Sequence, residues 1–392
     1  METIVELYDK EPVLNFLAAC SFRPENIVYL CDMDSPVEEN LKTARDFFRL
    51  RGQRVNVSAH EVKGRGIKSY MRAFDEIYHA YPGCVIDVTG GSDLALVAAG
   101  MFTQQHEQAK VFTFSKRKRR FFDIYNCPEV NDLKLTEKFT IDELIAMSGA
   151  KVSGHGHFDP KGTDGNALSG IGRIWDIFLA NRYTWHRNVQ YLQSILKLHG
   201  KSLHVEAPLM SPSSSGRFER SQYKIMRELA DAGVIQNMHV TKKKLTFDYK
   251  SEDIRRCLTD VGMCLELYVY KTAIESGFFD DVSISVIIDW NGRIAEPHDT
   301  TNEIDVMLTK GATPVFISCK TGNPSTTALN EVHTLATRLG GVFAKPVLVT
   351  MNELSELSPS TYKRAGELDI TIIEYSDLAE GKLEQKLKDI VK

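Results

Sequence analysis

The chain has 392 residues, which at roughly 150 residues per domain predicts two or three domains. Hydrophobic residues make up 43% of it and charged residues 26%, an ordinary globular composition that argues against a disordered chain. The 48 basic and 52 acidic residues give a formal net charge of −4, which excludes a histone-like or polybasic protein but leaves room for a nucleic-acid enzyme with one local basic groove.

The sequence also predicts a cytoplasmic protein. Its opening, METIVELYDKEP, is acidic where a signal peptide needs a basic start and an apolar run, so secretion is not expected. No stretch approaches the ~18 apolar residues of a membrane span. The 7 cysteines are scattered and never spaced as CxxC, so we expect reduced thiols and no structural zinc site.

Strand and helix signals alternate through the N-terminal part. Strand-like segments, each followed by a helix-like one, lie at 4–8, 26–32, 54–62 and 84–91. This alternation is typical of a parallel, Rossmann-like sheet. Two further strands are expected to flank a basic turn at 116–120, which we interpret as a solvated hairpin tip, with contact to nucleic acid or to a partner subunit as the alternative.

The rest of the chain changes character twice. Residues 148–172 are rich in glycine and polar residues and predict a linker or loop, and a helix containing Ile174 to Leu198 follows. Residues 216–249 predict a winged-helix-like arrangement of a helix and a β-ribbon. From 253 the order becomes helix, three strands, helix, strand. The expected α/β architecture is therefore an N-terminal domain (1–145), a connector (146–252) and a C-terminal domain (253–392).

The strands of the C-terminal domain carry an acid and a lysine that alternation places together. Asp305 and Glu303 share one face of NEIDV, while Ser318 and Lys320 share one face of PVFISCK, and the two strands are expected to pair. Carboxylates bind Mg²⁺ or Mn²⁺, and a lysine beside them can offset the charge that develops at a phosphate. The pattern permits metal-dependent phosphodiester hydrolysis; a plain salt bridge at the sheet edge is the alternative.

This layout, over residues 253–350, resembles the PD-(D/E)xK nuclease core. The resemblance implies that Glu266, Asp305 and Lys320 are catalytic, with Glu266 and Asp305 as metal ligands. The chain departs from the motif at Ser318, where the second acid is expected. Carboxylates that could replace it are Glu331, expected in the first turn of the next helix and included in the catalytic set, and also Glu303 and Glu296.

A second candidate site follows the strand at 84–88. Thr89, Gly90, Gly91 and Ser92 stand between this strand and a helix, where backbone N–H groups favour anionic or polar ligands. A plain tight turn is the alternative. Neither GxGxxG in the first βα unit nor a P-loop is present, and His155 and His157 in GHGHF are interpreted as loop residues rather than metal ligands.

Together, the stretches around 86–100, GMCLELYVY, NEIDVMLTKGATPVFISCKTG and LATRLGG resemble the CRISPR-associated Rossmann-fold (CARF) ancillary nucleases of type III systems. The resemblance implies a homodimer that binds a cyclic oligoadenylate, cyclic tetra-adenylate above all, and then cleaves single-stranded RNA or DNA or nicks duplex DNA in antiviral defence. It implies ligand contacts by the four turn residues 89–92 and by Tyr8, Asp9 and Lys10. Many relatives carry a basic residue where this chain has Asp93.

Two alternatives stay open at this point. One is a CARF-type transcription regulator in which residues 216–249 bind duplex DNA and Lys242, Lys243 and Lys244 form the wing that contacts phosphate. The other is a restriction-type nuclease independent of any nucleotide, which leaves the N-terminal domain without a role.

Overall fold

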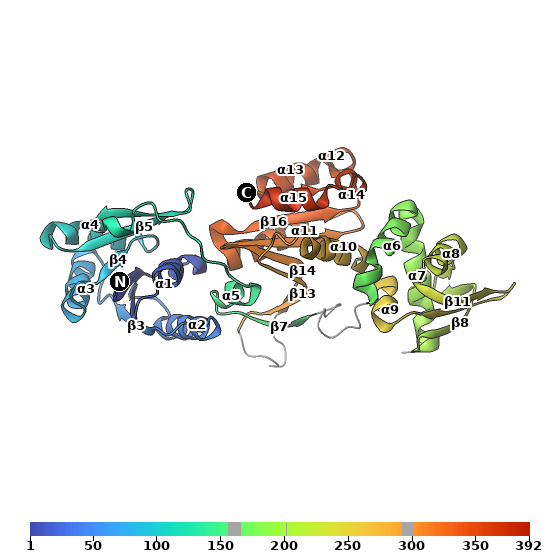
Figure 1. Cartoon of the computed structure of the whole chain (residues 1–392), viewed down its shortest axis with the longest axis horizontal. Helices are drawn as coiled ribbons and strands as arrows, with labels where there is room; N and C mark the ends of the chain where they lie inside the picture. The colour runs from blue at the N-terminus through green and yellow to red at the C-terminus, as the bar shows by residue number, and fades with distance from the viewer. Residues whose placement is uncertain (156–165, 201, 292–300) are drawn as a thin grey trace.

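The computed structural model of the chain describes residues 1–155, 166–200, 202–291 and 301–392. Three regions follow one another along the longest axis of the molecule, and their spatial order differs from their order in the sequence (Figure 1). The N-terminal domain lies at one end, the C-terminal domain in the middle, and the connector at the far end. The connector therefore follows the N-terminal domain in the chain without separating the two domains in space.

The N-terminal domain is built on a six-stranded sheet in the order β3-β2-β1-β4-β5-β6. Its strands are β1 (Thr3–Leu7), β2 (Asn26–Cys31), β3 (Asn56–Glu61), β4 (Val85–Asp87), β5 (Lys110–Ser115) and β6 (Arg120–Tyr125). The first five are parallel and β6 pairs antiparallel with β5, which confirms the Rossmann-like sheet and the terminal hairpin.

Helices cover both faces of this sheet. They are α1 (Leu17–Phe22), α2 (Val37–Leu50), α3 (Ile67–Ala80) and α4 (Asp93–Gln105), with short 3-10 turns at Pro12–Asn15 and Pro128–Val130. Ile4 packs against α1 and α2, whereas Val5 packs against α3 and α4, because successive side chains of a strand point to opposite faces. In α2, Leu41, Ala44 and Phe48 recur at helical spacing and are buried.

The C-terminal domain also has a six-stranded sheet, in the order β17-β16-β15-β14-β13-β7. Its strands are β7 (Lys151–His155), β13 (Asp281–Asp289), β14 (Thr301–Lys310), β15 (Thr313–Lys320), β16 (Lys345–Thr350) and β17 (Thr371–Ile373). Pairing is antiparallel from β7 to β15 and parallel from β15 to β17.

Two helices pack on opposite faces of this sheet. They are α10 (Met263–Glu275) and α11 (Thr326–Gly340), and their buried residues belong to separate cores. The predicted order of helix, three strands, helix and strand is thereby confirmed as α10, β13, β14, β15, α11 and β16. The remaining elements are α5 (Ile141–Ala146), a 3-10 turn at Gly341–Phe343, α12 (Leu354–Leu357), α13 (Pro359–Glu367), α14 (Tyr375–Ala379) and α15 (Leu383–Ile390).

The expected linker at 148–172 is wrong at both of its ends. Lys151–His155 forms β7, which pairs with β13 as the last strand of the C-terminal sheet, and α6 (Asn166–Ala180) begins inside the range. An edge strand with a single neighbour needs few apolar side chains, so the glycine-rich sequence did not indicate it. His157 lies outside the described residues.

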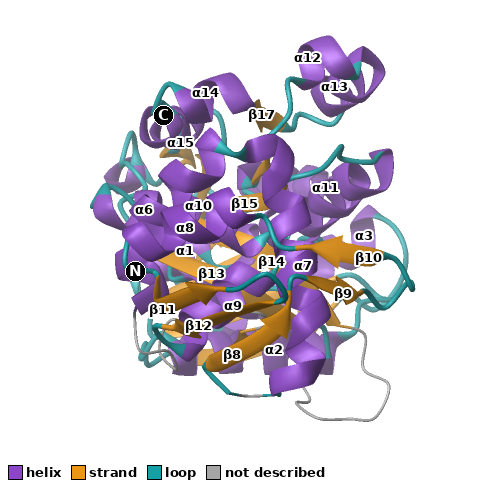
Figure 2. Cartoon of the chain, turned by 90° about the vertical axis from the view of Figure 1, so that its right-hand side faces the viewer, coloured by secondary structure: helices purple, strands orange, loops and turns teal. Residues whose placement is uncertain are grey.

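The connector contains the predicted winged-helix-like arrangement, whose strands face the viewer in Figure 2. It consists of α7 (Arg182–His199), β8 (His204–Pro208), β9 (Met210–Pro212), β10 (Phe218–Arg220), α8 (Tyr223–Asp231), β11 (Ile235–Val240), β12 (Lys244–Tyr249) and α9 (Glu252–Thr259). Strands β11, β12 and β8 form an antiparallel sheet. The single helix expected at 174–198 is divided between α6 and α7 at Asn181, whose side-chain amide donates to the Ile177 carbonyl at 2.9 Å.

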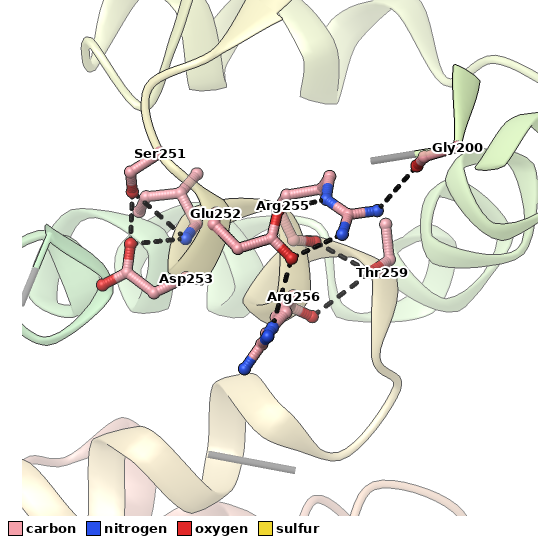
Figure 3. A network of polar contacts seen from close by, with 8 residues as sticks. Gly200, Ser251, Glu252, Asp253, Arg255, Arg256 and Thr259 are labelled. Carbon is pink, nitrogen blue, oxygen red and sulfur yellow. Dashed lines mark hydrogen bonds and ion pairs between the residues drawn. The ribbon is translucent and has the colours of Figure 1, made fainter. Parts of the chain in front are cut away.

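The connector and the C-terminal domain share one hydrophobic core. The rings of Trp175 in α6 and Tyr268 in α10 stack, with their centroids 4.0 Å apart and an angle of 6° between the ring planes. Figure 3 shows the start of α9, where Ser251 caps the helix by accepting from Ile254 N at 3.4 Å and Arg255 donates to the Gly200 carbonyl at 3.2 Å. This packing fixes the connector against the C-terminal domain.

Polar contacts through α5 and through the turn between β5 and β6 join the N-terminal sheet and its helices to the C-terminal sheet. Arg51 at the end of α2 binds Glu143 of α5 at 3.0 Å, and Ile141 N donates to Asp281 of β13 at 2.9 Å. In the turn between β5 and β6, Arg119 hydrogen-bonds Thr313 at the start of β15 and lies 5.7 Å from the Phe343 ring. The basic turn is therefore not simply a solvated tip, although Arg117 remains exposed.

No helix in the ranges described above is long and apolar enough to cross a membrane. All seven cysteines are buried and none forms a disulfide.

Candidate functional site

Asp305 and Lys320 lie side by side on two inner strands of the C-terminal sheet. Lys320 Nζ is 3.3 Å from Asp305 Oδ2, which also accepts from Cys319 N at 2.7 Å and from Ser318 Oγ at 3.4 Å. The pair forms a salt bridge, but β14 and β15 are not edge strands. Ser318, which replaces the expected acid, thus orients Asp305.

Two adjoining cavities bring the candidate residues together. A cavity of about 330 Å³ has Glu266, Asp260 and Gly262 in its walls, and a second of about 230 Å³ has Glu331 and Ser318 in its walls. Both are lined by Glu303, Asp305 and Lys320. The proposed catalytic residues therefore line a depression formed by these two cavities, at the end of β15 and beside the middle of β14.

Glu266 enters this depression from the first turn of α10. Burial raises the pKa of its carboxyl well above the ordinary value, and the charges of Asp305, Asp260 and Glu303 raise it further. A Cβ on Gly262 would lie 2.6 Å from Glu266 Oε1, so the glycine leaves room for the carboxylate. The site thus holds several acids that repel one another, a property typical of functional sites.

Lys320 responds to the same charges in the opposite direction. Burial by itself lowers the pKa of a lysine, but the Asp305 charge and hydrogen bond outweigh it and raise the pKa above the ordinary value. Lys320 is therefore a fixed positive charge inside an acidic depression.

Two acids stand differently from what the sequence predicted. Helix α11 begins at Thr326, capped by Ser325, so Glu331 lies in its second turn rather than its first. Asp260 was missed: its Oδ1 accepts from Gly262 N at 2.8 Å and Met263 N at 3.0 Å at the start of α10, and an aspartate just before a helix was the available signal. Glu296 lies outside the described residues.

The donor set suits a hard cation. In the part of the chain that the structure describes, no group of three or more His, Cys, Asp or Glu side chains could hold an ion by itself. Mg²⁺ is nevertheless commonly bound by one or two carboxylates, with water and substrate phosphate completing its shell. Glu266 and Asp305, facing one cavity, fit that mode.

The second candidate site lies at the ends of β1 and β4, neighbouring strands where the order of the N-terminal sheet reverses. Gly91 N donates to Asp9 Oδ2 at 2.8 Å, which joins the two strand ends. Gly91 has φ +96°, and a Cβ there would lie 2.6 Å from Leu7 Cβ; a Cβ on Gly90 would lie 2.6 Å from Asp9 Cβ. Such a switch point is the usual ligand site of open α/β sheets.

Hydroxyl groups of the turn are held by two acids, the buried Asp87 and the half-buried Asp32. Thr89 Oγ1 donates to Asp87 and accepts from Phe114 N at 2.8 Å. Ser92 caps α4 and donates to Asp32 Oδ1 at 3.1 Å, and Tyr70 OH donates to the same oxygen at 2.6 Å. Asp32 and Tyr70 were missed by sequence reasoning, although Asp32 directly follows β2.

The other expected ligand residues differ in exposure. Tyr8 packs edge-on against Tyr29 with ring centroids 5.6 Å apart, and burial raises its pKa to about 12. Lys10 and Asp93 are exposed. Residues 8–10 and 89–92 thus meet at one end of the sheet. The exposed Lys10 places a positive charge at the border of this candidate site.

Part of the chain matches a family model, and the whole chain is similar to solved structures. Residues 251–392 match the family model described as Card1-like, endonuclease domain. The chain is similar to protein VC1899 from Vibrio cholerae, with a TM-score of 0.76 and 18% identity over 99% of this chain and 97% of that one. It is also similar to Can2 from Sulfobacillus thermosulfidooxidans in complex with cyclic tetra-adenylate, with a TM-score of 0.72 and 17% identity over 100% of both chains.

No curated protein matches the sequence. The family match and the shared fold confirm both the resemblance to CARF-type ancillary nucleases and the α/β fold class predicted from the sequence.

Proposed function

We propose that the protein is an endonuclease of type III CRISPR antiviral defence, active in the cytoplasm and switched on by cyclic tetra-adenylate. The observation that carries this proposal is the convergence of Glu266, Asp305 and Lys320 on one cavity, within a segment that matches an endonuclease family model. The overall likeness to Can2, whose structure contains cyclic tetra-adenylate, supports the choice of activator.

The C-terminal site would hydrolyse a phosphodiester. Mn²⁺ or Mg²⁺, held by Glu266 and Asp305, would supply Lewis acidity toward the phosphate. Lys320 places a positive charge beside the phosphate, where negative charge develops in the transition state. Ser318 and the Cys319 amide keep Asp305 oriented, and Glu331 would supply to the same depression the acid that is missing at position 318.

The activator would bind at the turn of residues 89–92, against Asp9, Tyr8 and Lys10. Backbone N–H groups at the start of α4 favour its phosphates. The hydroxyl and amide of Thr89 already bond Asp87 and Phe114, and the amide of Gly91 already bonds Asp9, so we assign these groups to shaping the turn. The other amides of the turn and Lys10 are assigned to the ligand.

The protein would act as a homodimer through α4. One side of this helix is buried in the monomer, yet the opposite side is also apolar and exposed, at Leu94, Leu96, Val97 and Met101. A helix that is apolar all round is usually buried on all sides, and a second copy of α4 would complete the burial. Paired turns would then face one cyclic ligand.

A cleavage assay tests these proposals together. Purified protein is given single-stranded RNA, single-stranded DNA or supercoiled plasmid, with Mn²⁺ or Mg²⁺, with and without cyclic tetra-adenylate. Cleavage of any of these substrates that rises with the activator and stops in EDTA is expected. Sequence-specific binding of duplex DNA without cleavage would instead favour the alternative function, a transcription regulator that binds DNA through residues 216–249. In that function the exposed wing residues Lys242 and Lys243 would contact phosphate.

A further inference from the structure

A third cavity adjoins the catalytic one and has a different chemistry. It measures about 590 Å³ and lies between the start of α7 and the loop after β16. Thr321 and Gly322, which directly follow Lys320, belong to the walls of both cavities. Met351, also in its wall, donates its backbone N–H to the Lys320 carbonyl at 3.2 Å. A nucleic-acid strand bound at the catalytic residues would pass over this third cavity.

The wall contributed by α7 is aromatic and held in place. The Tyr183 side chain is among the most exposed large apolar groups of the described chain, at 82%, while Trp185 and Phe178 form the cavity's buried side. Arg182 lies 4.4 Å from the Tyr183 ring and 3.7 Å from the Tyr375 ring, and it hydrogen-bonds the Tyr183 hydroxyl. Arg182 therefore lies over the Tyr183 ring, most of which stays accessible to solvent.

The opposite wall can hydrogen-bond a heterocycle. The side-chain nitrogen of Asn352 is buried and has no hydrogen-bond partner among the described residues, and the Glu356 carboxylate is exposed nearby. An amide and a carboxylate complement the ring and exocyclic nitrogens and oxygens of a base. The wall contains two acids, Glu353 and Glu356, against one arginine, Arg182, so it lacks the excess of positive charge that a phosphate site needs.

We propose that this cavity, the base pocket, receives one unpaired nucleobase of the substrate strand, stacked on Tyr183, next to the phosphate that is cleaved. The inference rests on the proposed nuclease function and extends it to the substrate: a base inside a duplex is already stacked and paired, so the pocket selects single-stranded nucleic acid. Stacking on an aromatic ring accepts any base, which predicts weak sequence preference.

The test compares Tyr183→Ala with Tyr183→Phe, which keeps the ring, and with Tyr362→Ala, which removes a tyrosine that is also exposed, at 45%, but lies outside the pocket. With activator and Mn²⁺, we expect Tyr183→Ala to raise KM for a single-stranded substrate by roughly 10-fold or more, because base stacking contributes strongly to single-strand affinity. Tyr183→Phe and Tyr362→Ala should retain the wild-type KM, and all three variants should retain the wild-type melting temperature.

A binding measurement in EDTA separates the base pocket from the nuclease activity. A single-stranded oligonucleotide carrying 2-aminopurine should lose fluorescence on binding to wild-type protein and to Tyr183→Phe, but much less on binding to Tyr183→Ala. Absence of quenching with wild-type protein, or equal behaviour of the alanine and phenylalanine variants, overturns the inference even if the enzyme cleaves. Quenching without cleavage of any substrate retains the pocket and overturns the proposed catalytic function.

Discussion

At the scale of single residues, the site is defined by acids gathered around one lysine. Glu266 and Asp305 lie on different elements yet share a cavity, so the charge of Asp305 raises the cost of ionising Glu266. A bound cation would relieve this repulsion. Without a cation the cluster lowers the stability of the fold, so its presence favours a role in metal binding over a structural role. Lys320 supplies the one positive charge that the described walls of this cavity contain.

Removing that charge tests the catalytic assignment. We expect Lys320→Ala to reduce cleavage by roughly 10²–10³-fold at saturating substrate, because the charge acts on the transition state more than on the bound substrate. Lys386→Ala is the matched control, since Lys386 forms a comparable ion pair with Asp377 at 3.0 Å away from the cavity. Full activity of Lys320→Ala in the activator-dependent assay would refute the assignment.

Glu266→Gln tests the raised pKa of the carboxyl group. Above the ordinary glutamate pKa of about 4.3, the folded protein retains a proton that the unfolded chain releases, so this carboxyl makes stability fall as pH rises toward the raised value. In metal-free buffer, Glu266→Gln should melt at a higher temperature than wild type at alkaline pH, with a smaller change of melting temperature with pH. Cleavage should be lost. Identical dependence of melting temperature on pH in wild type and Glu266→Gln would show that the pKa of Glu266 is not raised.

At the scale of elements, the strands carrying the site were predictable and the helices less so. Alternation along NEIDV and PVFISCK was enough to place Asp305 beside Lys320, because pairing of neighbouring strands fixes which side chains meet. The turn that holds Glu331 was not predictable in the same way, since the start of α11 depends on the cap at Ser325. Asp260 was missed because its hydrogen bonds serve a helix start that the sequence pattern left imprecise.

The glycine turn at the N-terminal site permits an element-level prediction. Gly91→Ala should lower the free energy of unfolding by about 1–3 kcal/mol and weaken the thermal shift produced by cyclic tetra-adenylate, because its φ is +96° and its Cβ would collide with Leu7. Gly172→Ala in α6 is the control: nothing lies within 4 Å of its Cβ, so it should be neutral or stabilise by about 0.5–1 kcal/mol. Urea unfolding measures both effects. Equal stability of the two variants would contradict the prediction.

At the scale of the whole molecule, a chain of contacts joins the two candidate sites. Asp9 binds Gly91 in the turn and accepts from Glu11 N at 2.8 Å, and Glu11 forms an ion pair with Lys116 at 3.4 Å. Three residues on, Arg119 reaches Thr313 at the start of β15, the strand that ends at Lys320. A movement of the turn on ligand binding has a direct physical route to the catalytic strand.

Arg119→Ala should therefore weaken activation without abolishing ligand binding. We expect the stimulation by cyclic tetra-adenylate to fall about 2- to 30-fold, the range usual for residues along a coupling route. The thermal shift on adding the activator should persist. Arg117→Ala, an exposed neighbour in the same turn, is the control and should retain full stimulation. Unchanged stimulation in Arg119→Ala would show that the domains communicate elsewhere.

The spatial order of the regions could not be derived from local patterns. Signals for strands and helices identify elements, but they do not say that the connector packs beyond the C-terminal domain, since that depends on contacts such as Trp175 on Tyr268. The same holds for β7, whose partner β13 lies far along the chain.

Strand β7 also limits where the gene can be cut if the nuclease domain is to fold without the rest of the chain. The segment matching the endonuclease family, residues 251–392, does not contain a complete domain. The missing strand is Lys151–His155, which lies outside the segment and pairs with the edge of β13. A gene fragment encoding only 251–392 would expose that strand and the Tyr268 ring, and its product should aggregate where a fragment from 148 onward stays monodisperse in gel filtration. Any recombination that moves the nuclease to another sensor would have to carry the strand, and with it the connector.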